Sequence, residues 1–403
     1  MAGEWRTYRL GDVCSKIGSG ATPRGGSGVY LEHGEIALIR SQNIHNDGFH
    51  HDGITYLTEE HAAELANVEV DERDVLLNIT GDSVARSCQV DAGVLPARVN
   101  QHVAIIRPDP AVLWPRFLRY YLVSPVMQAE MLSLAGAGAT RNALTKGMIE
   151  LFEVPAPADI DEQRAIARIL GTLDDKIELN RRMNDTLEAM ARAIFKSWFV
   201  DTIQNGLPDG WHEDSVYAAA SIIYGAPFAS ARFNAEKIGR PLIRIRDLAG
   251  ERPGVFTNEE HPKGYLVKPG DIVVGMDGEF RAHLWGGEES WLNQRICVFV
   301  PKPGFSAPFL LNSIIGPLVE IETTETATTV IHLGKNDIDR FKIVVPDQQT
   351  LSRFNHLADP IFKKIVLNKQ ESRTLAALRD TLLPKIISRE LRITDVDRIV
   401  TRQ

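Results

Sequence analysis

The amino-acid sequence contains the same set of landmarks twice, in the same order, within 403 residues. Each copy is followed by a long amphipathic segment. A chain with such a repeat folds into pseudo-symmetric parts, which suit a target with two halves, and duplex DNA is the commonest target of this kind. The matched landmarks are Leu38–Arg40 with Leu242–Arg244, Val70–Val75 with Val267–Ile272, Gly81 with Gly278, Asn100-Gln101 with Asn293-Gln294, and Leu144–Lys146 with Leu333–Lys335.

The two amphipathic segments have apolar residues at alternating spacings of four and three, which is typical of coiled-coil helices. An Asn interrupts both seams at the same place, and a buried Asn fixes the register of such helices. We expect the two helices to pack on each other antiparallel, with one globular domain at each end. Some 40 residues at about 1.5 Å each give a length of roughly 60 Å. The first seam is Ile166, Leu170, Leu173, Ile177, Asn180, Asn184, Leu187, Ala191, Ile194 and Trp198, and the second is Phe354, Ala358, Ile361, Ile365, Asn368, Ser372, Leu375, Arg379, Leu382 and Ile386.

Prolines, glycines and acidic residues mark where these helices begin and end. Pro155 and Pro157 precede the first helix, and Pro346-Asp347 precedes the second. Pro384 predicts a kink near the end of the second helix. The globular parts show short strand-like and helical runs, so the predicted fold class is α/β of the mixed α+β kind. The predicted segments are residues 1–157 (first globular domain), 158–204 (first long helix), 205–345 (second globular domain) and 346–403 (second long helix and C-terminal tail).

Composition limits the class of protein. The net charge of −8 argues against DNA binding by bulk charge, although binding depends on where the basic groups lie. No apolar run approaches the roughly 20 residues of a membrane span, and the N-terminal residues do not resemble a secretory signal. Three cysteines that are far apart fit a reducing compartment. We therefore expect a cytoplasmic protein with no membrane association.

The sequence contains no recognisable catalytic motif, which argues against an enzyme. The glycine-rich stretch that begins at Gly18 lacks the pattern of a P-loop, and no GxSxG or HExxH motif occurs. Asp174-Asp-Lys176 has the spacing of a nuclease metal site, but we interpret it as the solvated face of a helix. The cluster His45, His50, His51 and Asp52 matches no standard zinc spacing. The sequence therefore predicts no catalytic residue, bound cofactor or metal.

Several stretches resemble the specificity (S) subunit of type I restriction–modification enzymes. The resemblance rests on Trp5–Val13, Glu162–Ile177, Ala193–Asp201 and Leu378–Leu391, and it extends over essentially the whole chain. One departure is Pro346–Leu351, which lacks the fuller pattern at the start of the first helix.

The resemblance implies a division of roles among subunits. Each globular part would be a target recognition domain that reads one half of a bipartite, asymmetric DNA site. The helix pair would set the gap and dock two methyltransferase (M) subunits, and through them two restriction/translocase (R) subunits. S-adenosylmethionine, ATP and Mg would be bound by these partners. Two alternatives remain: a coiled-coil scaffold whose globular ends bind proteins, and a fused nuclease or methyltransferase.

Within this interpretation, polar side chains in loops are candidates for DNA contacts, because Arg, Asn and Gln can make paired hydrogen bonds to base edges. The alternative is that they are ordinary loop residues or, for the Asn-Gln pair, fold-supporting ones. The apolar residues Phe195, Trp198 and Phe199 form either a partner-docking patch or core at the junction of helix and domain. The DNA candidates are Arg24, Arg40, Asn43, Arg86, Arg98 and Lys146 in the first half, and Arg232, Arg244, Arg246, Arg281, Arg295 and Lys335 in the second.

Overall fold

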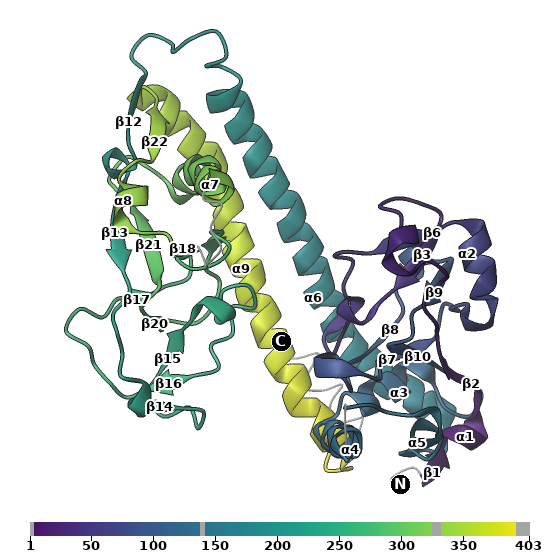
Figure 1. Ribbon diagram of the computed structural model, residues 1–403. Coiled ribbons are helices and arrows are strands. Elements are labelled where there is room, and N and C mark those ends of the chain that lie inside the picture. The colour runs from purple at the N-terminus through teal and green to yellow at the C-terminus, as the bar shows by residue number, and fades with distance from the viewer. Residues whose placement is uncertain (1–3, 138–141, 325–331, 392–403) are drawn as a thin grey trace. The chain divides into compact units, whose positions relative to one another are not determined.

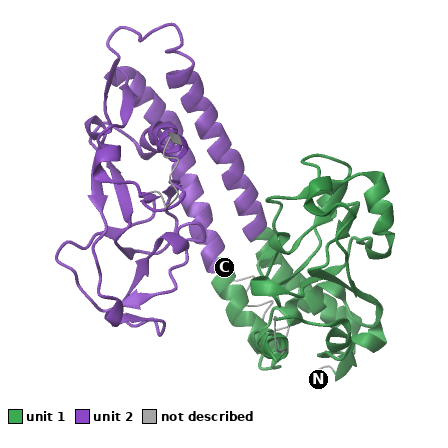
Figure 2. Ribbon diagram, in the orientation of Figure 1, with its two compact units in different colours: residues 1–176, 375–403 green, residues 177–374 purple. Residues whose placement is uncertain are grey.

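The computed structural model describes residues 4–137, 142–324 and 332–391, so the predicted C-terminal tail beyond residue 391 lies outside the described residues. The chain forms two compact units (Figure 2). Unit 1 comprises residues 1–176 and 375–403, and unit 2 comprises residues 177–374. Each unit therefore contains one copy of the sequence repeat together with part of both long helices. No helix in the described ranges is both long and apolar enough to cross a membrane.

Unit 1 is built on a four-stranded antiparallel sheet and a three-stranded sheet with one parallel pair (Figure 1). The buried apolar residues of the four-stranded sheet face two cores, one beneath each of its surfaces. The larger sheet has the order β2 (Cys14–Ser19), β10 (Val103–Pro108), β7 (Val75–Asn78), β8 (Ser87–Gln89), and the smaller has the order β6 (Thr55–Leu57), β3 (Ile36–Ile39), β9 (Ala97–Val99). Two further pairs are β1 (Trp5–Arg9) with β11 (Glu153–Pro157) and β4 (Ile44–His45) with β5 (Gly48–Phe49).

Three short helices of unit 1 begin at capping residues. Thr58, Ser124 and Thr145 each accept a hydrogen bond from a backbone N–H in the first turn of the helix that follows, and Pro125 occupies the first turn after Ser124. Such caps satisfy amide groups that have no partner inside the helix. The helices are α1 (Leu10–Val13), α2 (Glu59–Glu64), α3 (Pro115–Leu122), α4 (Pro125–Gly136) and α5 (Lys146–Glu150).

Unit 2 repeats the strand order of the main sheet, which confirms the structural duplication expected from the sequence. It also repeats the parallel strand pair, here β15 with β20. The main sheet has the order β13 (Ala220–Tyr224), β21 (Ile296–Pro301), β18 (Ile272–Gly275), β19 (Ala282–Leu284). The other strands are β14 (Phe233–Asn234), β16 (Phe256–Thr257), β15 (Arg240–Ile243), β20 (Ser290–Leu292) and β17 (Leu266–Val267) in one sheet, and β12 (His212–Ser215) with β22 (Lys342–Val345). The helices are α7 (Ala307–Thr324) and α8 (Lys335–Ile338).

A glycine at the same point of each main sheet allows a close backbone approach. A Cβ on Gly20 would lie 1.7 Å from the carbonyl oxygen of Val99, and a Cβ on Gly225 would lie 1.9 Å from that of Asn293. No side chain fits at such distances, so both copies of the repeat require glycine there.

The long helices are α6 (Ile160–Phe195) and α9 (Gln348–Ile387). In unit 1, Leu170 lies in the same core as Leu382 and Ile386. In unit 2, Leu187 and Ala191 pack with Ile361 and Ile365. Asn180 of α6 contacts Ser372 of α9, and Asn184 contacts Ile365 and Asn368, so rising residue numbers in α6 meet falling numbers in α9, which confirms antiparallel pairing (Figure 1).

The interrupting asparagines lie in the seam as predicted, and both are buried. The side-chain amide of Asn180 donates to Glu371 at 2.8 Å and to Ser372 at 3.2 Å. The amide of Asn368 donates to Oδ1 of Asn184 at 2.8 Å. These directional bonds are satisfied in one alignment of the two helices, and they therefore specify their register.

Asp174 corrects one expectation from the sequence, because its carboxylate is not on a solvated face. Its side chain is 13% exposed and accepts hydrogen bonds from Arg119, Tyr120 and Arg379, each at 2.7 Å. The neighbouring Asp175 is 65% exposed, as expected. The contacts of Asp174 join α3, α6 and α9 within unit 1, which gives this residue a structural role.

Candidate nucleic-acid interface

Arg40 and Arg244 follow matched strands and occupy equivalent positions. In each case a 3₁₀ turn comes directly after the strand, and its third residue caps the arginine's own backbone N–H. The cap is Asn43 at 3.0 Å in unit 1 and Asp247 at 2.9 Å in unit 2. The repeat therefore presents an arginine at the same structural position twice.

The two arginine side chains are held by different partners. The guanidinium of Arg40 donates to the carbonyl of Gly53 and lies 5.7 Å from the ring of Tyr30. The guanidinium of Arg244 pairs with Asp247 at 3.2 Å, and its side chain is 25% exposed. Both side chains are half-buried, so only the exposed part of each guanidinium is accessible to DNA.

Two candidates in the first half are held inside the fold. Asn43 is fully buried and donates to the carbonyls of His50 and Asp52. Arg98 lies in β9 and not in the loop where we expected it, and it donates to the carbonyls of Ala62 and Ala97. These bonds occupy the amide of Asn43 and part of the guanidinium of Arg98, and they give both residues a role in supporting the fold. Their contact with DNA stays a prediction.

The remaining arginine candidates lie nearer the surface of their own units. Arg24 is 92% exposed beside Glu64, and Arg281 is 70% exposed and pairs with Glu279 at 2.8 Å. Arg232 and Arg246 are also exposed, and Arg86 is half-buried. Surface pairs of this kind contribute little to stability, so these side chains can exchange a carboxylate for a phosphate at small cost. Their contact with DNA stays a prediction.

Lys146 and Lys335 open the short helices α5 and α8 in the two units. Each lysine is exposed and pairs with an acidic residue four positions later, Glu150 at 3.5 Å and Asp339 at 2.9 Å. The structure therefore places the two lysines equivalently, as the repeat predicted. Phosphate contact by either lysine remains a prediction.

The repeated Asn-Gln pair supports the fold through its first member. Asn100 is buried, its Oδ1 accepts from the backbone N–H of His102, and its carbonyl accepts from the N–H of Gly20. In unit 2, the carbonyl of Asn293 also lies beside Gly225, but the backbone N–H of Gly225 donates to the carbonyl of Ile296. The second members, Gln101 and Gln294, are exposed.

Phe195, Trp198 and Phe199 belong to an aromatic cluster of unit 2. The ring of Phe199 lies 5.2 Å from that of Phe309 and 4.9 Å from that of Phe354, and Phe199 is 3% exposed. Of the two interpretations that the sequence left open, these contacts favour core for Phe199. The half-buried Trp198 still presents part of its ring for docking, which stays a prediction.

Sequence reasoning missed a polar cluster beside Arg295. His332 lies 2.7 Å from Asp277 through Nδ1, and Arg295 lies 3.5 Å from the same carboxylate oxygen. Arg295 has φ +71°, a backbone conformation that L residues seldom adopt. Asp277 and His332 are more than fifty positions apart in the sequence, so only the fold brings them together.

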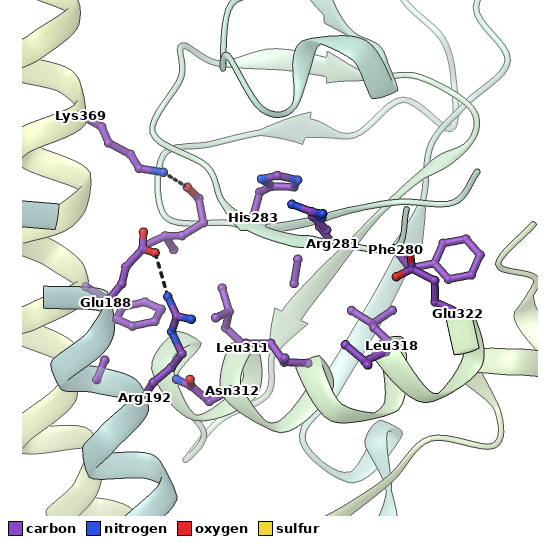
Figure 3. Close-up of a pocket in the computed structure, with 16 residues that line it drawn as sticks. Glu188, Arg192, Phe280, Arg281, His283, Leu311, Asn312, Leu318, Glu322 and Lys369 are labelled. Carbon is purple, nitrogen blue, oxygen red and sulfur yellow. Dashed lines mark hydrogen bonds and ion pairs between the residues drawn. The ribbon is translucent and has the colours of Figure 1, made fainter. Parts of the chain in front are cut away.

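A pocket of about 580 Å³ lies within unit 2 and is lined by α6, α7, α9 and β19 (Figure 3). Several of its charged groups are paired: Glu188 lies 3.7 Å from Arg192, and Lys369 donates to Leu284 at 2.8 Å and pairs with Glu251. Burial, together with the positive charges of Lys369 and Arg281, lowers the pKa of His283. Lys369 therefore connects α9 to Leu284 and Glu251, whereas the Glu188–Arg192 pair lies within α6.

The three cysteines are free thiols in the fold. Burial raises the pKa of Cys14, Cys88 and Cys297 to about 12 in each case. A thiol with such a pKa is a poor nucleophile at neutral pH, because the thiolate is the reactive form.

The matching family model and the related proteins agree on one protein family. Residues 2–189 and 225–375 match the type I restriction modification DNA specificity domain. The specificity subunit of the MjaIX enzyme from Methanocaldococcus jannaschii is 28% identical over 329 residues, covering 75% of this chain and 74% of that one. The specificity subunit of the HindI enzyme from Haemophilus influenzae is 23% identical, covering 96% of this chain and 100% of that one.

A solved structure shares the fold. The S subunit of a type I restriction–modification system from M. genitalium superposes with a TM-score of 0.55 at 16% identity, covering 95% of this chain and 96% of that one. The likeness extends over both units and both long helices, so the two chains have the same architecture.

Proposed function

Because this chain belongs to the specificity family of type I restriction–modification systems, we propose that each of its units reads one half of a bipartite, asymmetric DNA site. The observation that carries the proposal is the duplicated topology, in which the same sheet order and the same arginine position occur once in each unit. The sequences of the surrounding loops differ between the copies. Equal frameworks with different loops suit two half-sites of different sequence.

The paired helices would determine the number of undefined base pairs between the two half-sites. A coiled coil is a stiff element, and its register is specified here by the asparagines at positions 180 and 368. The helices would also dock two M subunits and, through them, two R subunits. The weaker repeat of the first helix's opening pattern in Pro346–Leu351 implies that the two M-binding surfaces differ in detail.

The chemistry would belong to these partners. S-adenosylmethionine would be bound by the M subunits, and ATP and Mg by the R subunits. This chain would supply sequence recognition and geometry and would be non-catalytic by itself.

The proposal is tested by co-expressing the chain with its M subunit and mapping methylated adenines across the host genome. A split motif, with two short defined blocks around a fixed gap, is expected. A stable complex that adds no new motif would contradict DNA reading by this chain and would favour the protein-binding scaffold.

Arg244 provides a residue-level test within unit 2. We expect Arg244→Ala to weaken binding to the cognate site, because it removes a cation from the matched arginine position. A matched control is Arg240→Ala, which removes an exposed arginine from the other end of the same strand. Unchanged cognate affinity in Arg244→Ala, with normal thermal unfolding, would exclude Arg244 from the interface.

Salt dependence of the affinity separates phosphate contacts from base contacts. The logarithm of the binding constant should fall with the logarithm of the salt concentration, with a slope of about −0.9 per phosphate contact. Loss of one phosphate-contacting lysine, such as Lys146 or Lys335, should make this slope shallower by about one. An affinity without salt dependence would contradict binding to the DNA backbone.

A further inference from the structure

We infer that the β4–β5 hairpin of unit 1 and the residue that follows it form a binding site for a divalent transition metal, with Zn²⁺ the best fit. The ligands are His45, Asp47 and His50. The sequence does not predict metal ligation by this trio, because the spacing His-x-Asp-x-x-His matches no standard zinc motif. The site is independent of the proposed DNA-reading function.

The fold brings the three ligand groups to one point. One ligand atom from each residue lies within 4.8 Å of those of the other two. Oδ1 of Asp47 lies 3.3 Å from Nε2 of His50. Two ligands at 2.0–2.1 Å from a tetrahedral Zn²⁺ are about 3.3 Å apart, so this pair already has the separation that the ion requires.

The hairpin explains how the two imidazoles meet. His45 ends β4 and lies opposite Gly48, which has no side chain, and His50 comes directly after β5. The two rings stack with their centroids 4.0 Å apart, so one ring must rotate about its side-chain bonds to bring both in-plane lone pairs to a single ion. Asp47 lies in the two-residue turn between the strands, so its carboxylate reaches the same side as both rings.

The surroundings hold the ligands as zinc sites commonly do. Nε2 of His45 lies 2.9 Å from the carbonyl oxygen of Gln42. A carbonyl only accepts, so this bond places the proton on Nε2 and leaves the lone pair on Nδ1. A ligating histidine that donates its second N–H to a carbonyl is a frequent arrangement around metals, because it fixes the tautomer and the ring orientation.

The turn itself is fixed by Asn46. Its Oδ1 accepts from the backbone N–H of Ser87 at 3.0 Å, and its amide donates to Gln128 at 3.1 Å. Its carbonyl accepts from Arg119 at 2.9 Å. The ligands on either side of Asn46 are thus attached to a rigid support, which reduces the entropy lost when a metal binds.

The donor set selects the kind of ion. Two imidazole nitrogens and one carboxylate oxygen suit Zn²⁺ and similar transition ions, whereas Ca²⁺ and Mg²⁺ prefer oxygen ligands. Three protein ligands leave a fourth position for water. The neighbouring His51 pairs with Asp91 at 2.9 Å, so it belongs to a separate contact.

The test uses the purified full-length chain, freed of metal with a chelator and titrated with Zn²⁺ by calorimetry and with Co²⁺ by visible absorption. We expect His45→Gln and His50→Gln each to lower affinity for both ions by at least about tenfold. The matched control is His33→Gln, an exposed histidine of the same unit, which should bind as the unsubstituted chain does. Equal binding by all four proteins, or no stoichiometric binding by the unsubstituted chain, would overturn the inference.

Two further measurements cover the case in which a histidine variant does not fold. Asp47→Asn keeps the shape of the turn and removes the anionic ligand, so it should also lower the affinity for Zn²⁺. X-ray absorption of the unsubstituted, zinc-loaded chain should show two imidazoles among nitrogen and oxygen ligands at about 2.0–2.1 Å. A spectrum with sulfur ligands or without imidazole would exclude the site.

Discussion

Replacement of Asp174 by Ala provides the sharpest test of how unit 1 is held together. The substitution removes the carboxylate that accepts hydrogen bonds from Arg119, Tyr120 and Arg379. Asp174 lies on α6, its first two partners lie on α3, and Arg379 lies on α9. One side chain therefore connects three helices of the same unit.

The expected cost follows from the burial of the partners. The side chains of Arg119 and Arg379 are 6% and 9% exposed, so water cannot replace the lost carboxylate. Removal of one partner from a buried ion pair destabilises a protein by about 3–5 kcal/mol. For a unit of this size each kcal/mol lowers the melting temperature by about 2–4 °C, which gives a decrease of roughly 6–20 °C.

Differential scanning calorimetry of the full-length chain measures this decrease. Asp175→Ala is the matched control, because Asp175 is the next residue of the same helix and its side chain is 65% exposed, although its partner Arg116 is half-buried. A pair with a solvated partner contributes less than a buried pair, so this control should lower the melting temperature much less than Asp174→Ala does.

Equal decreases for Asp174→Ala and Asp175→Ala would refute the argument, since it depends on the difference in burial. A double variant provides a second check. With Asp174→Ala already present, Arg379 keeps only its ion pair with Asp380, whose side chain is 60% exposed. Arg379→Met then removes a buried charge that has lost its buried partner, and it should restore part of the lost stability. Additive losses in the double variant would show that the two side chains are not coupled.

Two further predictions concern the backbone and the pH dependence of stability. Gly20→Ala should strongly destabilise unit 1, because its Cβ would meet the carbonyl of Val99. The control Gly18→Ala, whose Cβ meets nothing within 4 Å, should unfold at nearly the original temperature. Similar melting temperatures for the two variants would contradict the close approach at Gly20. Asp347 accepts two hydrogen bonds from Thr350, which lower the pKa of Asp347 to about 2, below the usual value of about 3.9. The contribution of Asp347 to stability is therefore present above about pH 4 and is lost as the pH falls towards 2. Asp347→Asn should flatten the decrease in melting temperature between pH 4 and pH 2, and an unchanged decrease would assign the acid sensitivity to other groups.

The long helices were predictable from the sequence because their pattern is local. The spacing of apolar residues identified both seams, and the matching positions of Asn180 and Asn368 indicated that the two seams face each other. Pro346-Asp347 marked the start of α9 correctly, and Asp347 caps its first turn. Each of these signals comes from residues within a few turns of one another.

Contacts from a third element were not predictable. Asp174 has the sequence context of a solvated helix face, but α3 covers it and supplies two donors. Arg98 has the context of a loop cation, but it lies in β9 and pairs with Glu69 at the edge of a core. In both cases burial depends on partners that are far away in the sequence, which a reading of local pattern does not contain.

Only part of the proposed interface could be predicted from the sequence, because the rest depends on contacts that a local pattern does not contain. The equivalence of Arg40 and Arg244 was visible in the repeat, whereas the burial of Asn43 depends on carbonyl groups of the segment that ends at Asp52. The trio of His45, Asp47 and His50 lies within six residues, yet its convergence depends on a tight turn at Asn46 and Asp47. Sequence spacing alone did not indicate that turn.

The composition of unit 1 has a consequence for synthesis on the ribosome. Its core includes Leu382, Leu383 and Ile386, although the rest of that core is complete in the chain by residue 176. Translation at about 5–20 residues per second needs roughly 10–40 s to reach this last part of the core. During that interval the nascent first unit exposes the apolar face that α9 later covers, while unit 2 is made and can fold in between. A stop codon shortly after residue 374 would therefore damage the first unit more than the second, although the residues removed follow the whole of unit 2 in the sequence.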